Sequence, residues 1–131
     1  MKTKIKEQHL ENNSWQRNGL PGWTYQSDAL FQLEAEELFR KHWQFVCHIS
    51  ELNEVGSYKT IDIVNERGFV IKCEKNLIRA FHNLCMHRGS RVIADKEGIC
   101  ERAIFCPFHG WSYNFDGSVR GVPNKDSFGD T

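Results

Sequence analysis

The sequence predicts a small, mainly β protein in which antiparallel strands form a sandwich or barrel after one N-terminal helix. Three observations predict this fold class. From residue 58 onward, short runs rich in β-branched and aromatic residues alternate with turn residues. Asp116-Gly117 separates two of these runs and is a favoured hairpin turn. Before this region, residues 28–41 place apolar side chains at helical spacing.

The first part of the chain is expected to hold an arm and a leader. Residues 1–20 are mostly polar and lack periodicity, so we expect a loose N-terminal arm. Residues 21–50 form a helical leader, in which Ser27 is a suitable N-cap for a helix over 28–41. The apolar run 43–49 follows the helix and is predicted to be a short buried strand.

The remainder, residues 51–131, is predicted to form the β domain. A turn is expected at residues 65–68, where the sequence reads NERG. The two stretches that combine cysteine with histidine fall between strand-like runs and are therefore expected to be loops. The expected strands are 58–64, 69–73, 77–83, 98–105, 110–115 and 118–122.

Composition narrows the classes of function. The chain has 131 residues, of which 40% are hydrophobic, enough to build one compact core. Basic and acidic residues number 17 each, so the charge gives no sign of nucleic-acid or membrane binding. No apolar run approaches the ~20 residues of a membrane span. The N-terminus lacks the apolar stretch of a secretory signal, and we expect a cytoplasmic protein. Five cysteines, an odd number, argue against a disulfide framework.

Two short motifs carry the chemistry: Cys85-x-His87 and Cys106-x-x-His109. Thiolates and imidazoles select zinc, copper or an iron–sulfur cluster. A structural zinc site remains possible, although the familiar zinc motifs pair cysteine with cysteine and histidine with histidine. In extended backbone, residues two positions apart point to one side, about 6 to 7 Å apart at the backbone. A centre with two metal ions accepts that spread more easily. In a Rieske [2Fe–2S] centre, one iron has two cysteine ligands and the other has two histidines.

The residues around these motifs resemble a known family. FHNLCMHRGSRV (81–92) and CPFHGWSYNFDGSVRGVP (106–123) are similar to the Rieske domain of ring-hydroxylating oxygenase α-subunits. The helix and WQFVCH (43–48) also resemble the leader of these subunits. The resemblance extends from about Pro21 to Pro123, and it implies a Rieske-type sandwich or barrel with a cluster-binding subdomain.

The resemblance implies a ligand set and a direction of electron flow. Cys85 and Cys106 would bind one iron of a [2Fe–2S] cluster, and His87 and His109 the other. Single electrons would come from a reductase or ferredoxin. They would pass to a mononuclear Fe(II) in a separate catalytic oxygenase domain, usually that of a neighbouring subunit.

Residues beside the ligands are expected to support the cluster. The two glycines let the backbone approach it without a Cβ, and N–H groups there can donate to its sulfides. The proline stiffens the second motif, and the two aromatic residues either shield the cluster from water or serve ordinary packing. The arginine either contacts the electron acceptor or is a solvated charge. These residues are Arg88, Gly89, Pro107, Gly110, Trp111 and Tyr113.

Three positions argue against the respiratory-chain branch of Rieske proteins. Those proteins carry an additional cysteine in each motif, where this chain has Ser90 and Phe108, so that bridge cannot form. Trp111 replaces their sulfide-bonding serine. Since fewer donors stabilise the reduced state less, we expect a potential near the low end of the Rieske range, about −150 mV.

The chain has no histidine after His109, so it lacks the two histidines of the usual mononuclear iron site. We expect it to be part of a longer α-subunit or to work with its Rieske domain alone. A free-standing Rieske ferredoxin is the first alternative, and the leader at 21–50 argues against it. A structural zinc module is the second alternative. The substrate stays open between aromatic acids and quaternary ammonium compounds such as betaines.

Overall fold

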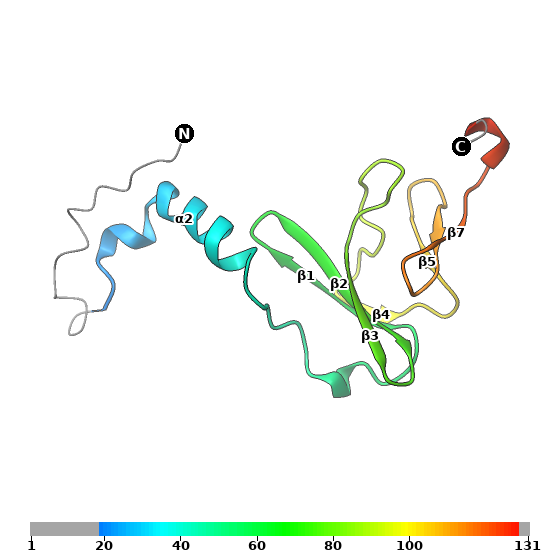
Figure 1. The fold of residues 1–131 in the computed structure, drawn as a ribbon, viewed down its shortest axis with the longest axis horizontal. Coiled ribbons are helices and arrows are strands. Elements are labelled where there is room, and N and C mark those ends of the chain that lie inside the picture. The colour runs from blue at the N-terminus through cyan, green and yellow to red at the C-terminus, as the bar shows by residue number, and fades with distance from the viewer. Residues whose placement is uncertain (1–18, 129–131) are drawn as a thin grey trace. The chain divides into compact units, whose positions relative to one another are not determined.

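The computed structural model describes residues 19–128, which form two compact units that divide between Gln44 and Phe45 (Figure 1). Most of the arm predicted for residues 1–20 lies outside the described residues. Within residues 19–128, no helix is long and apolar enough to cross a membrane.

The N-terminal unit contains the predicted helix in a shortened form. The Ser27 hydroxyl accepts a hydrogen bond from the Leu30 amide at 3.2 Å, which confirms the predicted N-cap. After Glu34 the hydrogen bonding widens, and the Arg40 amide reaches back to the Ala35 carbonyl at 3.2 Å. The helix therefore ends at Phe39 as a π-helical turn rather than continuing to residue 41. The helical segments are η2 (Gly22–Tyr25), α2 (Asp28–Glu34) and η3 (Ala35–Phe39).

The buried strand predicted for residues 43–49 is wrong. Residues 43–48 pair with no strand of the described chain, and Trp43 and Phe45 are exposed, Trp43 by 102%. The run crosses the division between the two units, and no strand of the described residues pairs with it. Its apolar side chains therefore did not indicate a strand. It leads into a 3-10 turn, η4 (Ile49–Glu51), capped by His48.

The second unit, from Phe45 onward, confirms the mainly β, antiparallel fold (Figure 1). A four-stranded sheet has the order β3-β2-β1-β4, and a three-stranded sheet has the order β5-β6-β7. All strand pairs are antiparallel. The elements are β1 (Ser57–Ile63), β2 (Glu66–Glu74), β3 (Leu77–His82), β4 (Glu97–Ile99), β5 (Ile104–Phe105), β6 (Ser112–Tyr113), β7 (Val119–Gly121) and η5 (Lys125–Phe128).

Two details of the strand prediction differ from the structure. The first turn is Val64-Asn65, because Glu66 already pairs with Ile63. Val64 has φ 55°, a region that β-branched residues rarely adopt, so the sequence did not indicate that the turn begins at this residue. The predicted strand 98–105 is two short strands: β4 belongs to the first sheet and β5 to the second. The chain changes sheets within this segment.

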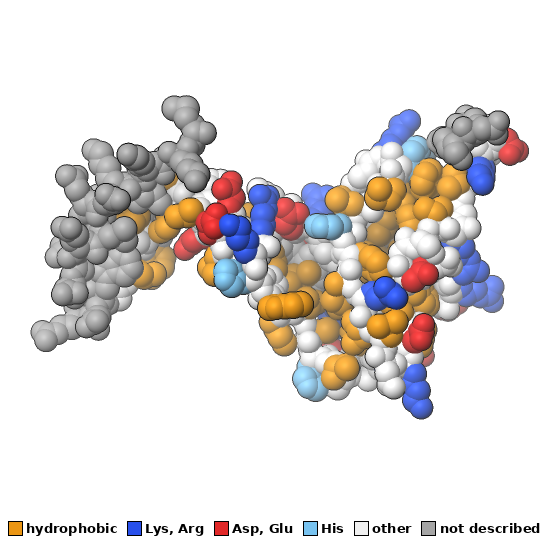
Figure 2. Space-filling view, viewed as in Figure 1, with side chains coloured by type: hydrophobic (Ala, Val, Ile, Leu, Met, Phe, Trp, Pro, Cys, Tyr) orange, Lys and Arg blue, Asp and Glu red, His pale blue; other side chains and the backbone are white. Residues whose placement is uncertain are grey.

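The core of this unit reaches the two motif cysteines. Tyr58, Phe69 and Ile71 contribute buried side chains from the first sheet, and Ile104 and Tyr113 contribute them from the second. Cys85 and Cys106 belong to the same buried cluster. Each fully buried large aliphatic side chain contributes about 1.5–3 kcal/mol. The cysteines are thus held by the hydrophobic core, whereas other hydrophobic side chains reach the surface (Figure 2).

Candidate metal centre

The two motifs form two loops at the same end of the β unit (Figure 1). The first loop, residues 85–90, follows β3 and is separated from β4 by irregular backbone. The second loop, residues 106–111, connects β5 directly to β6 and is the connection of a short hairpin. The prediction that both motifs lie in loops is confirmed.

The backbone hydrogen bonds of the two loops match. The Cys85 amide donates to the Ser90 carbonyl, and the Cys106 amide donates to the Trp111 carbonyl, both at 2.7 Å. Each bond spans five residues and folds the loop back on its own cysteine. The equal pattern shows that both loops present their cysteine through the same backbone structure.

A glycine closes each loop. The Gly89 amide donates to the Cys85 carbonyl at 2.8 Å, and the Gly110 amide donates to the Cys106 carbonyl at 3.0 Å. Their φ values are 66° and 73°, the left-handed region in which glycine avoids the Cβ penalty. Both glycine amides thus hydrogen-bond within their own loops. Hydrogen bonding from the Phe108 and His109 backbone helps to lower the pKa of the Cys106 thiol.

The two motif sulfur atoms are buried and close together. Cys85 and Cys106 are each 2% exposed and belong to the same cluster of buried side chains. Burial raises the pKa of the Cys106 thiol, but hydrogen bonds from Ser90 and from backbone amides outweigh it and lower that pKa. All five cysteines lie within the described residues and none forms a disulfide.

The two motif histidines also lie together. The ring centroids of His87 and His109 are 4.7 Å apart with the planes at 67°. The His87 ring stacks on Trp111 at 5.2 Å with nearly parallel planes, and Phe108 packs against His109 at 4.0 Å. The Nδ1 atom of His87 is buried, whereas His109 is exposed to solvent. Burial, followed by the charges of His109 and Arg88, lowers the pKa of His87.

Tyr113 joins the site through its hydroxyl group. Its Oη lies 3.1 Å from the Cys85 sulfur and accepts a hydrogen bond from the Met86 amide at 3.0 Å. Burial and the hydrogen bond with Cys85 raise the pKa of Tyr113 to about 12. Trp111 covers the His87 ring, while Arg88 of the first loop and Pro107 of the second loop are exposed.

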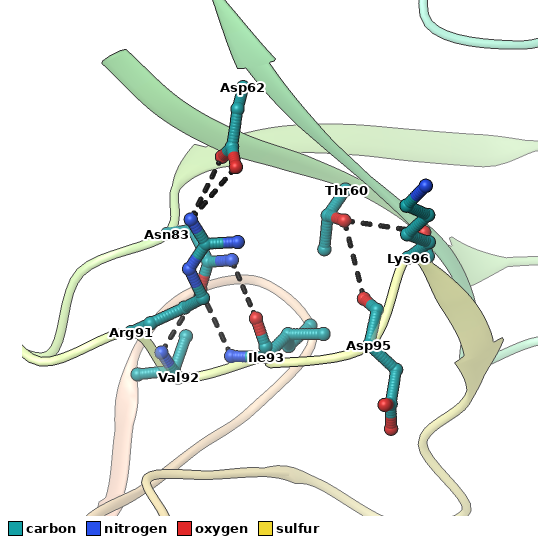
Figure 3. A network of polar contacts seen from close by, with 8 residues as sticks. All are labelled: Thr60, Asp62, Asn83, Arg91, Val92, Ile93, Asp95 and Lys96. Atoms are coloured by element: carbon teal, nitrogen blue, oxygen red, sulfur yellow. Dashed lines mark hydrogen bonds and ion pairs between the residues drawn. The ribbon is translucent and has the colours of Figure 1, made fainter. Parts of the chain in front are cut away.

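Asn83 holds the chain beside the first loop, and the sequence analysis did not identify it. Its side chain is fully buried, accepts hydrogen bonds from the Val92 and Ile93 amides at 3.0 Å, and donates to the Ile93 carbonyl at 2.8 Å (Figure 3). Arg91, between the loop and this clamp, makes an ion pair with Asp62 at 2.9 Å. An asparagine at the end of the strand-like run 77–83 was the available sequence signal.

Ser90 was considered only for the disulfide that it cannot form. In the structure its hydroxyl lies 3.2 Å from the Cys106 sulfur, on the opposite loop. The direction of this side chain depends on the left-handed backbone at Gly89 immediately before it. Sequence spacing alone therefore did not place the hydroxyl at the site.

The donor set fits a two-iron cluster. Among residues 19–128, no three or more His, Cys, Asp or Glu side chains form a group placed to hold one metal ion. The structure instead presents one pair of sulfur atoms and one pair of imidazoles, with one member of each pair from each loop. A Rieske centre needs this division, with two cysteines on one iron and two histidines on the other.

Comparison with known proteins places this fold and donor set in a family. The protein-family model of the Rieske [2Fe-2S] domain matches residues 42–129 of this chain. The chain therefore belongs to the Rieske [2Fe-2S] domain family, whose cofactor is the [2Fe–2S] cluster. Its homologues are the N-terminal Rieske regions of oxygenase α-subunits, as the sequence resemblance predicted.

Individual relatives act on different kinds of substrate. The carnitine monooxygenase oxygenase subunit of Acinetobacter baumannii is 35% identical over 102 residues, which cover 78% of this chain and 27% of the relative. Naphthalene 1,2-dioxygenase from Rhodococcus sp., solved with indole bound, has a TM-score of 0.82 and 31% identity over 98% of this chain and 30% of its own.

A third relative is a quaternary ammonium Rieske monooxygenase whose structure is described as giving insights into carnitine oxidation and inter-subunit electron transfer. It has a TM-score of 0.75 and 33% identity, covering 82% of this chain and 29% of its own. The chain thus spans less than a third of the length of the relatives it matches.

Proposed function

We propose that this protein transfers single electrons through a Rieske [2Fe–2S] cluster to the mononuclear iron of an oxygenase catalytic domain. Cys85 and Cys106 would hold one iron, and His87 and His109 the other. The observation that carries this proposal is the pairing of two buried sulfur atoms beside two neighbouring imidazoles, supplied by two loops of equal backbone structure.

The surroundings of these side chains suit one-electron transfer, which is the chemistry that a bound cluster supplies. Trp111 stacks on His87 and limits the access of water to that imidazole, and Tyr113 packs behind Cys85 and limits the access of water to the sulfur side of the site. His109 is exposed, which makes its ring the natural exit for an electron. The loops therefore combine a buried half, which contains the two sulfur atoms, with an open half at His109 that a partner can approach.

The proposed partners follow from the relatives. A reductase or ferredoxin would supply the electrons, and a catalytic domain holding Fe(II), including one of a neighbouring subunit, would receive them. The substrate of that domain would be an aromatic ring compound or a quaternary ammonium compound. The naphthalene dioxygenase match extends over 98% of this chain and so includes residues before β1, which favours an oxygenase α-subunit over a free-standing ferredoxin.

The test is anaerobic reconstitution of the 131-residue chain with iron and sulfide. We expect two iron ions and two acid-labile sulfides per chain, a red-brown colour, and a paramagnetic signal that appears on one-electron reduction by a reductase or ferredoxin. A colourless chain that retains one zinc ion and takes up no sulfide would contradict the proposal.

A further inference from the structure

Each motif sulfur contacts one side-chain hydroxyl group. Tyr113 Oη lies 3.1 Å from the sulfur of Cys85, and Ser90 Oγ lies 3.2 Å from the sulfur of Cys106. The two contacts differ in their origin. Tyr113 is on β6, outside the loops, whereas Ser90 is the last residue of the first loop and reaches the cysteine of the second loop.

Ligand chemistry fixes the direction of the Ser90 hydrogen bond. A cysteine that binds iron does so as a thiolate, which carries no hydrogen and can only accept. The hydrogen between Ser90 and Cys106 must then come from the serine hydroxyl, whose oxygen lies 3.2 Å from the sulfur.

The backbone holds Ser90 in place for this contact. Its carbonyl accepts the Cys85 amide at 2.7 Å, and the preceding Gly89 has the left-handed φ that turns the chain toward the second loop. Ser90 is half-buried, so bulk water competes only in part for its hydroxyl. A hydroxyl fixed in this way loses little further freedom when it bonds a sulfur.

We propose that Ser90 is a positioning residue that donates to the Cys106 sulfur across the two loops and thereby raises the reduction potential of the cluster. This inference rests on the proposed function. One electron from the reductase or ferredoxin enters the cluster, the hydrogen stays on the serine oxygen, and no covalent bond forms or breaks. Added negative charge on the ligand sulfur strengthens the hydrogen bond, so the contact favours the reduced form.

The expected size follows from the charge that the ligand sulfur gains, because hydrogen bonds to charged groups are the stronger ones. We expect loss of the hydroxyl to change the equilibrium constant for one-electron reduction about tenfold. A tenfold change corresponds to about 59 mV for a one-electron couple. The predicted reduction potential near the low end of the Rieske range took no account of the Ser90 hydroxyl. With this donor, the expected reduction potential is higher.

The experiment is a potentiometric titration of the reconstituted 131-residue chain, followed by absorbance and by the paramagnetic signal of the reduced state. Ser90→Ala is expected to lower the midpoint potential by about 59 mV, the shift that corresponds to a tenfold change in the equilibrium constant. Ser90→Thr keeps the hydroxyl and is expected to keep the midpoint. Ser112→Ala is the matched control, because the buried Ser112 hydroxyl donates to the Gly121 carbonyl at 3.3 Å rather than to sulfur.

The outcomes separate this inference from the proposed function. An unchanged midpoint in Ser90→Ala with an intact Rieske spectrum would overturn the role of Ser90 and leave the proposed function standing. Absence of the spectrum from the unmodified chain would contradict the proposed function itself. If Ser90→Ala does not retain the cluster, the comparison of Ser90→Val with Ser90→Thr tests the hydroxyl contact. Retention by Thr alone, at the unmodified midpoint, supports the hydroxyl contact, and loss from both overturns it.

Discussion

The two motif loops share one backbone pattern but are held in place in different ways. The second loop connects β5 to β6, whose register pairs Ile104 with Tyr113 and Phe105 with Ser112, so paired strands fix both of its ends. The first loop leaves β3, an edge strand, and continues into irregular backbone. There the Asn83 side chain replaces the missing strand partner. The same loop shape can therefore be held by a hairpin or by one buried amide.

The position of the histidine is the second difference. It stands two residues after Cys85 but three residues after Cys106, so the loop position of His87 corresponds to that of Phe108. The rings of His87 and His109 nevertheless lie 4.7 Å apart. The offset lets two similar loops face each other without placing two imidazoles at the same point.

The largest expected effect is loss of the metal centre when either loop loses its histidine. His87→Ala or His109→Ala is expected to abolish the Rieske spectrum, because each removes one of two ligands from the same iron, and to lower stability, because the cluster ties the loops together. Iron and sulfide analysis together with the reduced-state spectrum measures this.

The matched control for the ligand variants is His82→Ala, at the end of β3 and close in sequence to the first loop but exposed. That variant is expected to keep the full cluster content. An unchanged reduced spectrum in His109→Ala would show that the ligand assignment is wrong.

Asn83→Ala is expected to destabilise the first loop strongly. It leaves the buried amides of Val92 and Ile93 without their acceptor, and each such group costs about 1–3 kcal/mol. We expect a decrease of about 3 kcal/mol in the free energy of unfolding, measured by urea denaturation. Asn53→Ala, at an exposed position, is the control. Equal free energies of unfolding for Asn83→Ala and Asn53→Ala would show that the Asn83 side chain does not hold the first loop in place.

Replacing the glycine that closes each loop is expected to lower the free energy of unfolding by an intermediate amount. An alanine in the left-handed region costs about 1–2 kcal/mol at either Gly89 or Gly110. At Gly110 a Cβ would also lie 3.3 Å from the Pro123 side chain, whereas at Gly89 it would meet no atom within 4 Å. The loss of unfolding free energy should therefore be larger for Gly110→Ala. Gly22→Ala, which has open space and no positive φ, should show none. The reverse order would contradict the packing of the second loop.

The smallest expected effect concerns pH. Burial and the Cys85 hydrogen bond raise the pKa of Tyr113 to about 12, against about 10 for an unfolded tyrosine. The folded chain holds this proton more tightly, so the stabilisation is complete below pH ~10 and is lost as pH rises toward 12. Ser90, the partner of the other sulfur, has no comparable titration.

The measurement is urea unfolding of the metal-free chain at several alkaline pH values, with a tyrosinate absorbance titration alongside. Tyr113→Phe should remove the component that titrates near pH 12. Tyr58→Phe is the control, because Tyr58 is also buried but belongs to β1. An unchanged alkaline titration in Tyr113→Phe would show that this hydroxyl is not the group responsible.

Local chemistry explains which features the sequence could predict. The Ser27 cap and the Asp116-Gly117 turn were predictable because each depends on neighbouring residues only, and Gly117 has the expected positive φ of 89°. The loop positions of both motifs were predictable from the strand-like runs around them. Their four cysteine and histidine residues meet at one end of the fold, although the ligand assignment itself stays a prediction.

The failures have a common cause in long-range contacts. The apolar run 43–49 was predicted to be buried, but the described chain offers it no strand partner. The segment 98–105 is strand-like throughout, yet its two ends pair with different sheets, a choice made by distant strands. Asn83 and Ser90 act on residues brought close by the fold, so spacing alone could not assign them.

The strand order of the first sheet has a consequence for the order of folding. β3 and β4 occupy opposite edges, and the chain between them carries the first loop. The meander β1-β2-β3 closes through short turns, which costs little chain entropy and is fast. β4 can join β1 only after residues 83–96 have crossed the sheet, so we expect this to be the slow step. The crossing segment carries Cys85, and we therefore expect the two motif sulfur atoms to meet only after the first sheet is complete, so that cluster insertion would follow its completion.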